Sequence, residues 1–133
     1  MPLVRIDLQE GRTPQELRKL ADTIQEVMLD VFAAPPRDRY QIITEHPKGH
    51  IIAEDTGLGL QRTGGIVIIQ IFQQGRSNEQ KVAAYAELAK QLEAECGVRP
   101  EDLIVSVMAN RHADWSFGQG RAQFLDGTLQ PPI

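Results

Sequence analysis

The second residue of the chain is a proline, and a proline in that position can become a catalytic group. Pro2 directly follows Met1, and a small residue in second place allows the initiator methionine to be removed. Removal would leave Pro2 with a free secondary amine. An α-amino group titrates at about 8, so burial or a nearby cation can tune it to act as an acid or a base. The alternative is a proline that only begins a strand, where no N–H donor is needed.

An arginine stands before each of two sequences that resemble helix starts. Arg76 precedes Asn-Glu-Gln by one serine, and both its guanidinium and the backbone N–H groups of the helix start would attract a carboxylate. Arg12 has the same place before the other helix and competes for this role. Each arginine has the alternative of a solvated surface residue. The pattern predicts an acid as ligand, with Arg76 as its first candidate.

Further candidates lie in the middle and at the end of the chain. Asp38 and Tyr40 together would orient or activate a water, whereas Asp38 alone would suit a turn or a helix cap. If the tail folds over the site, its larger apolar side chains would form a wall that favours discharge of a carboxylate as neutral carbon dioxide. The alternative for these side chains is a place in the ordinary core. They are Trp115, Phe117, Phe124 and Leu129.

Neither a metal nor a cofactor is expected from the sequence. The three histidines have no further ligand at a suitable spacing, and they are His46, His50 and His112. The glycines do not open a helix after a strand, as a phosphate loop or a dinucleotide site requires. The single cysteine, Cys96, cannot form an internal disulfide and is typical of a small core residue.

The elements that must position these residues occur twice, as an internal repeat of the sequence. Aligning Gly11-Arg12-Thr13 with Gly75-Arg76-Ser77 gives a shift of 64 residues (75 − 11), and the same shift pairs Asp38 with Asp102. Two copies of one supersecondary unit explain this pattern. We predict one domain over residues 1–133, with repeats at 1–46 and 65–110 and a tail at 111–133.

Each repeat is predicted to be a strand, a helix and a second strand. Hydrophobic periodicity predicts strands at 2–8, 40–44, 65–72 and 103–108. Capping boxes start the helices at 13–16 and 77–80; the first helix ends before Pro35, and the second ends near Cys96 with Gly97 as its stop. Residues 48–62 are expected to form a loop that can include a short hairpin, and the tail after Asn110 to be coil or a short strand.

These elements predict an α+β fold. A strand-helix-strand crossover gives a parallel pair with a right-handed connection, so the core should be a four-stranded, mostly parallel sheet with two helices on one face. Two helices leave the other face of the sheet uncovered. We therefore expect neighbouring copies of the chain to bury it in an oligomer.

Charge and composition exclude several classes of function. With 14 Lys and Arg against 18 Asp and Glu, the net charge is −4, and no basic face is offered to nucleic acid or to a membrane surface. The first thirty residues carry charges throughout and contain no apolar stretch for a signal peptide or a membrane span. These features favour a cytoplasmic protein.

Several motifs resemble the tautomerase superfamily, whose β-α-β units carry an N-terminal catalytic proline. Pro2, the Glu-Gly-Arg-Thr run at 10–13 and the Ile-Ile-Thr-Glu run at 42–45 are similar to its 4-oxalocrotonate tautomerase unit. The two-unit length resembles the subgroup that contains malonate semialdehyde decarboxylase and the chloroacrylate dehalogenases. Within that subgroup, the run Asp-Trp-Ser-Phe-Gly at 114–118, followed by Gly-Arg-Ala at 120–122, looks like the decarboxylase branch. The resemblance covers nearly the whole chain.

The resemblance implies a homotrimer with Pro2, Asp38 and Arg76 as catalytic residues. It implies that the substrate contacts Tyr40, Gln74, Trp115, Phe117, Phe124 and Leu129. The chain departs from the family at two positions. Gln74 stands where the best-known decarboxylase has the first of two arginines, and Tyr40 stands where the short tautomerases have an arginine.

By this resemblance, the expected activity is decarboxylation of a short 3-oxo acid such as malonate semialdehyde, without a cofactor, together with hydration of unsaturated acids. The enzymatic alternative is keto-enol tautomerisation of a 2-oxo acid such as phenylpyruvate, with neutral Pro2 as the base. The pKa of Pro2 decides between them. An alternative of another class is a non-catalytic trimeric interaction protein, because fold alone does not fix function.

Overall fold

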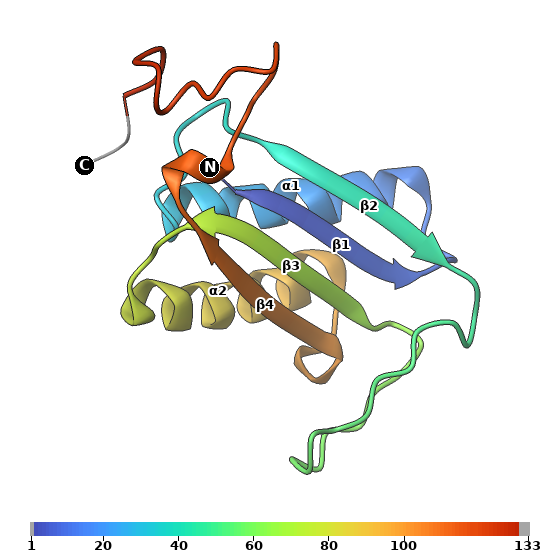
Figure 1. Ribbon diagram of the computed structural model, residues 1–133. Helices are drawn as coiled ribbons and strands as arrows, with labels where there is room; N and C mark the ends of the chain where they lie inside the picture. The colour runs from blue at the N-terminus through green and yellow to red at the C-terminus, as the bar shows by residue number, and fades with distance from the viewer. Residues whose placement is uncertain (1, 131–133) are drawn as a thin grey trace.

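The structure is a computed structural model that describes residues 2–130. Its elements follow in the order β1 (Leu3–Gln9), α1 (Pro14–Asp30), β2 (Tyr40–His46), β3 (Val67–Gln74), α2 (Asn78–Cys96) and β4 (Leu103–Asn110) (Figure 1). Two single turns of 3-10 helix, Pro100–Asp102 and His112–Asp114, flank β4. None of the helices within residues 2–130 is long and apolar enough to cross a membrane.

The four strands form one sheet in the order β2-β1-β3-β4. Within each repeat the two strands are parallel, and the repeats join through the antiparallel pair β1 and β3. Leu3 lies opposite Tyr40 on one side and Phe72 on the other, and Gln74 lies opposite Asn110. The predicted α+β fold with a mostly parallel sheet is confirmed.

Local hydrogen bonds explain where the helices begin and end. Thr13 Oγ1 accepts from the backbone N–H of Glu16 at 3.1 Å, and the Glu16 carboxylate accepts from the backbone N–H of Thr13 at 2.9 Å. Ser77 and Gln80 form the same capping box before α2. Gly97 ends α2 with a φ of 67°, in the left-handed region that favours glycine. Both predicted capping boxes and the predicted stop at Gly97 are confirmed.

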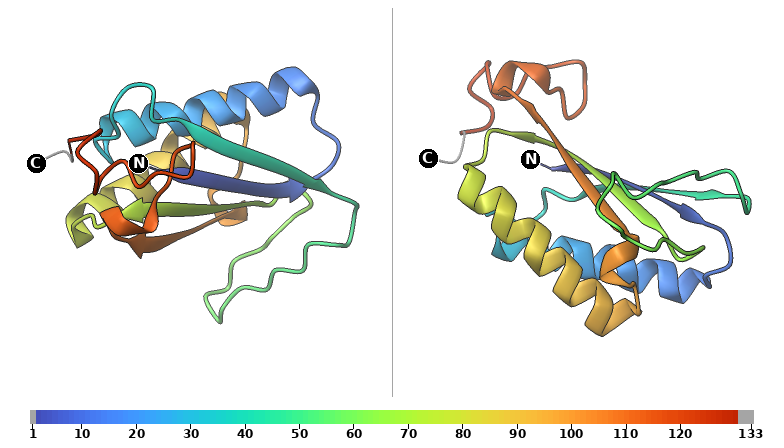
Figure 2. Two further views of the ribbon diagram at one scale, coloured as in Figure 1. Left: turned by 45° about the horizontal axis from the view of Figure 1, so that its top comes forward. Right: turned by 90° about the horizontal axis from the view of Figure 1, so that it is seen from below.

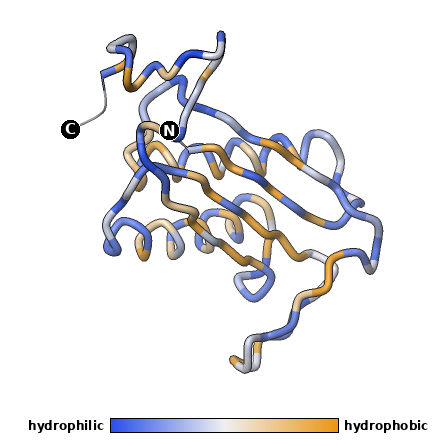
Figure 3. Tube along the Cα trace, viewed as in Figure 1, coloured by the Kyte–Doolittle hydropathy of each residue, from blue (hydrophilic) through white to orange (hydrophobic). Residues whose placement is uncertain are grey.

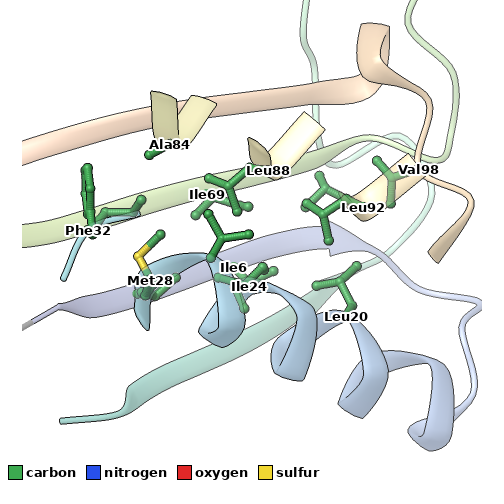
Figure 4. Close-up of a cluster of buried hydrophobic side chains, with 14 of the residues drawn as sticks. Ile6, Leu20, Ile24, Met28, Phe32, Ile69, Ala84, Leu88, Leu92 and Val98 are labelled. Atoms are coloured by element: carbon green, nitrogen blue, oxygen red, sulfur yellow. The ribbon is translucent and has the colours of Figure 1, made fainter. Parts of the chain in front are cut away.

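Both helices pack on one face of the sheet, and the core lies between the two layers (Figure 2). The strands contribute alternate residues such as Ile6 and Ile69, because successive side chains of a strand point to opposite faces. The helices contribute apolar stripes, and Figure 4 shows Leu20, Ile24 and Met28 of α1 facing Ala84, Leu88 and Leu92 of α2.

The other face of the sheet carries apolar side chains that no helix of the described chain covers. Tyr40 and Ile42 of β2 are 38% and 43% exposed to solvent. Figure 3 shows apolar residues along all four strands, although the helices cover only one side. Polar contacts also occur on the open face, where His46 Nε2 lies 2.7 Å from Asp7 Oδ1.

The two segments outside the regular elements differ in part from expectation. Residues 47–66 run away from the sheet and return without forming a strand, so the hairpin suggested within 48–62 is absent there (Figure 1). The segment turns where Asp55 accepts hydrogen bonds from the N–H groups of Gly57 and Gly59, at 3.1 and 3.0 Å. The tail is coil with the short helix His112–Asp114 and contains no strand up to residue 130.

Candidate active site

The sequence-predicted site residues gather at one end of the sheet. Because β1 is antiparallel to β3, the start of β1 lies beside the carboxyl ends of β3 and β4 and the start of β2 (Figure 1). Pro2, which is buried, directly precedes β1. The predicted removal of Met1 lies outside the described residues.

A cavity of about 500 Å³ opens beside the ends of β3 and β4. Its polar lining consists of Gln74, Arg76, Gln80, Asn110, Arg111 and His112. Within residues 2–130 no Asp or Glu side chain lines it. The described lining therefore carries two arginines and three amide side chains without an acidic residue, and this composition suits a carboxylate ligand.

Arg76 is held in place by backbone oxygens. Its Nε donates to the carbonyl of Phe32 at 2.8 Å, and Nη1 donates to the carbonyls of Gln74 at 3.1 Å and Gly75 at 3.2 Å. Burial lowers the pKa of Arg76 from its ordinary value, because desolvation disfavours the charged form. These contacts fix the guanidinium at the cavity wall before any ligand binds.

Gln73 connects Arg76 to the start of β1. The side chain of Gln73 is fully buried, and with its amide oxygen toward the guanidinium it accepts hydrogen bonds from Arg76 Nε at 3.1 Å and Nη2 at 2.5 Å. Continuing the antiparallel register from Leu3 and Phe72 by one residue places Pro2 beside Gln73. Gln73 is not among the residues expected at the site, since a glutamine near a strand end carries no signal without knowledge of this pairing.

Asp38 lies in the connection between α1 and β2, two residues before the start of β2. Its backbone N–H donates to the carbonyl of Pro35 at 3.2 Å. The preceding residue, Arg37, has a φ of 74°, and such left-handed geometry in a non-glycine residue often marks a functional segment. Burial raises the pKa of Asp38 above its ordinary value, and the positive charge at the amino terminus offsets part of this effect.

The aromatic residues of the tail form a cluster over the same end of the sheet. Trp115 stacks on Phe117 with ring centroids 5.3 Å apart, and Phe117 meets Phe124 edge-on at 5.5 Å. Phe117 also stacks on Tyr40, the first residue of β2, at 5.9 Å. Figure 2 shows the tail beside the amino end of the chain in both views. Trp115, Phe117 and Phe124 therefore lie together, and Tyr40 joins their cluster.

Two contacts join this aromatic cluster to the cavity. Trp115 Nε1 donates to Asn110 Oδ1 at 2.8 Å, and the ring of His112 lies 4.7 Å from that of Phe124. Asn110 and His112 both line the cavity. Leu129 is half-buried in the tail and donates its backbone N–H to the carbonyl of Gln123 at 3.0 Å.

Arg12, the competitor of Arg76, lies at the opposite end of the sheet. It follows the carboxyl end of β1, and its Nη2 donates to the carbonyl of Gly65 at 3.1 Å. Asp102, the repeat partner of Asp38, accepts hydrogen bonds from the N–H and hydroxyl of Thr63 at 2.7 and 2.5 Å. Arg12 and Asp102 thus hold the segment that leads into β3. Like Arg76, Arg12 donates a hydrogen bond to a backbone carbonyl, but it does so at the other end of the sheet.

Three polar side chains of the cavity lining carry no sequence signal that marks them as site residues. They are Gln80, Asn110 and Arg111; His112 was considered only as a metal ligand. Asn110 and Arg111 reach the cavity through the pairing of β3 with β4, which sequence patterns do not give, whereas Gln80 reaches it from the first turn of α2. Within residues 2–130, no group of three His, Cys, Asp or Glu side chains is arranged to hold a metal ion.

We expect Asp38→Asn to raise the stability of the protein at neutral pH. A carboxylate with a raised pKa binds more protons in the folded than in the unfolded state, so its ionisation lowers the free energy of unfolding as pH rises above the ordinary carboxyl value. The variant removes this cost, and its advantage should vanish at a pH where Asp38 is protonated in both states. Urea unfolding at pH 3, 5 and 7 measures this.

The same variant should lower the rate of a water-dependent reaction by about five- to tenfold, the value of one hydrogen bond. Asp22, whose pKa is lowered by its hydrogen bond from Arg39, is the matched control. Asp22→Asn should lose stability at pH 7 and keep activity. A less stable Asp38→Asn protein at pH 7 would contradict the expected desolvation cost.

Two family models, both described as tautomerase enzyme, match the chain, one over residues 38–118 and the other over residues 2–61. The chain is 50% identical over 129 residues to a Bacillus subtilis protein named "Probable tautomerase YrdN", which covers 97% of this chain and all of the relative. It is 36% identical over 127 residues to "Probable tautomerase YusQ" of the same organism, over 95% of this chain and all of the relative.

Solved structures of malonate semialdehyde decarboxylase are also similar. One, from a study of wild-type, proline-to-alanine and inactivated forms and of decarboxylase and hydratase activities, is 44% identical with a TM-score of 0.91, over 96% of this chain and 98% of the other. A second, inhibited by 3-bromopropiolate, is 43% identical with a TM-score of 0.92, over 98% and 99% of the two chains. A fused 4-oxalocrotonate tautomerase trimer shares the fold at 18% identity and a TM-score of 0.76, over 94% and 98%.

Proposed function

The chain belongs to the tautomerase superfamily, and from this premise we propose that it is a cofactor-independent enzyme that decarboxylates a short 3-oxo acid such as malonate semialdehyde. The observation that carries the proposal is the meeting of Pro2, the Arg76 cavity and the aromatic cluster at one end of the sheet. Near full-length similarity to two structures of malonate semialdehyde decarboxylase supports it.

In the proposed reaction, Arg76 holds the substrate carboxylate while protonated Pro2 polarises the 3-oxo group by donating a hydrogen bond to its oxygen. In the iminium form of the route, the neutral Pro2 amine condenses with the 3-oxo group and releases one water before the decarboxylation step. The bond between the carboxylate carbon and its neighbour breaks, and its electron pair moves toward the polarised carbon. Carbon dioxide leaves beside the aromatic cluster, because apolar surroundings favour loss of the carboxylate charge more than water does. A proton from Pro2 or from solvent then adds to the former neighbour carbon. Where an iminium has formed, water hydrolyses it, which regenerates the Pro2 amine and releases the aldehyde.

Hydration of an unsaturated acid is the proposed second activity of the same site. Asp38 and Tyr40 would position the attacking water. Asp38 lies two residues before β2 and Tyr40 is its first residue, so both are at the end of the sheet where Pro2 lies. Tyr40 is fixed by stacking on Phe117. The elevated pKa of Asp38 suits a group that exchanges protons with water.

Keto-enol tautomerisation is the second candidate, favoured by the names of the Bacillus subtilis relatives. It needs neutral Pro2 as a base, whereas decarboxylation needs protonated Pro2. Raising the pH should therefore increase tautomerisation and decrease decarboxylation as the amine loses its proton. The two reactions can be separated by their pH profiles on one protein sample.

The test is an intact-mass measurement followed by proton NMR of the protein with malonate semialdehyde and, separately, phenylpyruvate. We expect a mass without Met1 and conversion of malonate semialdehyde to an aldehyde. Faster turnover of phenylpyruvate, with no decarboxylation, would favour the tautomerase candidate. Retention of Met1 in an active sample would contradict the role of Pro2 in either reaction.

We further propose that the protein is a homotrimer in which the uncovered sheet face packs against neighbouring copies, and sedimentation velocity should show one species of three chains. The apolar exposure of Tyr40 and Ile42 supports this, and a fused 4-oxalocrotonate tautomerase of the same fold is a trimer. Ile42→Arg should shift the protein toward monomer, because it places a charge in the interface.

Val82→Arg is the matched control for the oligomer. Val82 lies on α2, on the helical side of the molecule, and is 65% exposed to solvent. This variant should sediment as the unchanged protein does. A stable monomer of the unchanged protein, or equal dissociation of both variants, would contradict the proposed packing of the sheet face.

A further inference from the structure

Gln73 is a polar residue at the end of a buried apolar row. Every second residue of β3 faces the helices, and this row begins with the fully buried Val67, Ile69 and Ile71. Gln73 continues the row, and its side chain is also fully buried. Burying an amide costs free energy unless the amide is hydrogen-bonded, so a glutamine in this place needs a polar partner.

That partner is the guanidinium of Arg76. The amide oxygen of Gln73 accepts from Arg76 Nε at 3.1 Å and from Nη2 at 2.5 Å, whereas a reversed amide would turn its NH2 group toward N–H donors. Nε and Nη2 form one edge of the planar guanidinium, and a carboxylate pairs with such an edge through two parallel hydrogen bonds. The Gln73 oxygen therefore occupies the position that a carboxylate would take on this edge.

The rest of the guanidinium is held by backbone carbonyls. Nε also donates to the carbonyl of Phe32 at 2.8 Å, and Nη1 donates to those of Gln74 and Gly75 at 3.1 and 3.2 Å. These backbone acceptors orient Arg76 without help from the Gln73 side chain. Because every nitrogen of the guanidinium already has an acceptor in the described chain, a bound acid meets donors that are shared rather than a free fork.

A limited hold on the carboxylate suits the proposed decarboxylation. The carboxylate is charged in the bound substrate and loses its charge as carbon dioxide forms, so an added contact with a cation stabilises the substrate more than the transition state. Such a contact would lower KM and kcat together. Blocking one edge of Arg76 avoids this loss, while the remaining contact still orients the acid in the cavity up to the transition state.

We propose that Gln73 is a positioning residue that limits how tightly Arg76 binds the substrate carboxylate, because its amide oxygen occupies the Nε–Nη2 edge. The carboxylate is then restricted to the Nη1–Nη2 end of the guanidinium. This inference rests on the proposed function of the same site. It gives Gln73 no contact with the reacting atoms.

Binding of an unreactive acid tests the block without any turnover. Propanoate has the three carbons of malonate semialdehyde and a single carboxylate. Trp115 is the single tryptophan of the chain and donates a hydrogen bond to Asn110 in the cavity wall, so its fluorescence reports occupancy. Gln73→Met keeps a long buried side chain but removes the acceptor. We expect this variant to bind propanoate about tenfold more tightly, as one charge-assisted contact implies.

Gln73→Glu should act in the opposite direction. Its carboxylate would pair with the Nε–Nη2 edge and neutralise Arg76, so propanoate should bind about tenfold more weakly. Gln25→Met is the matched control, because Gln25 is another buried glutamine, on α1, and lies outside the cavity lining of the described chain. It should bind propanoate as the unchanged protein does. Far-ultraviolet circular dichroism would show that each variant is folded.

Steady-state decarboxylation separates this role from a merely structural one. Gln73→Met should lower KM and kcat by about tenfold each and leave kcat/KM nearly unchanged, since the added contact is lost in the transition state. Structural damage at Gln73 would instead weaken propanoate binding in both variants and lower kcat/KM. If Gln73→Met does not fold, the affinity of Gln73→Glu decides the question.

Three results would overturn the inference. They are weaker or unchanged propanoate binding in Gln73→Met, tighter or unchanged binding in Gln73→Glu, or a lower kcat in Gln73→Met with an unchanged KM. The proposed function fails by a different measurement, the absence of malonate semialdehyde turnover by NMR. Opposite shifts of propanoate affinity in the two variants would establish the block on Arg76 even if decarboxylation were not observed.

Discussion

Replacing Pro2 with alanine is expected to lower kcat/KM for 3-oxo and 2-oxo acids by about a hundred- to ten-thousandfold, the range for loss of a positioned acid or base. Alanine keeps an amine but removes the ring that holds it. Pro2 is buried directly before β1, and the strand register places it beside Gln73. A primary amine free to rotate would lose that fixed position and the basicity of a secondary amine.

Pro14→Ala is the matched control for this variant. Pro14 is exposed at the first position of α1, far along the chain from the cavity lining. Its replacement should cost little stability, since alanine is tolerated at that position, and should leave the rate unchanged. Intact mass must show that Met1 is absent from both variants. An unchanged rate in Pro2→Ala would remove Pro2 from the mechanism altogether.

The elements fixed by short-range hydrogen bonds were the ones that could be predicted from sequence. Thr13 and Ser77 cap their helices within four residues, and Gly97 ends α2 through its own backbone geometry. The strand bounds were less accurate, because β3 begins at Val67 rather than at residue 65. Thr63 is held by Asp102, and the chain reaches the sheet two residues later than predicted.

The sequence could indicate only those candidate site residues that belong to a motif or have a distinctive residue type. Pro2, Asp38 and the tail aromatics could be selected in this way, and the structure brings them to one end of the sheet. Gln73 and Arg111 could not. Both stand at the ends of strands whose pairing joins residues far apart in the sequence, and that pairing is decided by the packing of the two repeats rather than by local preference.

The repeat leaves the choice between Arg12 and Arg76 open in the sequence, and only the three-dimensional arrangement resolves it. The shift of 64 residues makes Arg12 and Arg76 equivalent in sequence, yet β1 and β3 run in opposite directions. Equivalent positions of the repeats therefore fall at opposite ends of the sheet. Ile66 takes the place of Pro2 at the Arg12 end, and an isoleucine offers no amine. Of the two ends, only the one with Arg76 has both the amine and the cavity described above.

From this asymmetry we expect Arg76→Ala to lower kcat/KM by about ten- to a hundredfold, which corresponds to the loss of a charge-assisted contact of about 1.5–3 kcal/mol. Arg12→Ala should do little to the rate within one chain. Steady-state kinetics on the acid that the NMR test identifies would measure both. Equal losses in the two variants would contradict the assignment of the carboxylate to Arg76.

Stability must be measured beside the rate, because Arg76 also has a structural role. Its guanidinium donates to the carbonyls of Phe32 and Gln74, so alanine leaves buried acceptors without a partner. Arg12→Ala loses a comparable bond to the carbonyl of Gly65 and therefore controls for this effect. If both variants unfold at similar urea concentrations and only Arg76→Ala loses activity, the loss belongs to substrate binding.

Arg76→Lys separates charge from geometry in the same experiment. Lysine keeps the positive charge but cannot reproduce the planar fork that binds a carboxylate and the backbone oxygens together. We expect its kcat/KM to lie between those of the unchanged protein and Arg76→Ala, with most of the loss in KM. Full activity in both Arg76→Lys and Arg76→Ala would mean that another group holds the carboxylate, and the assignment of the site beyond Pro2 would be wrong.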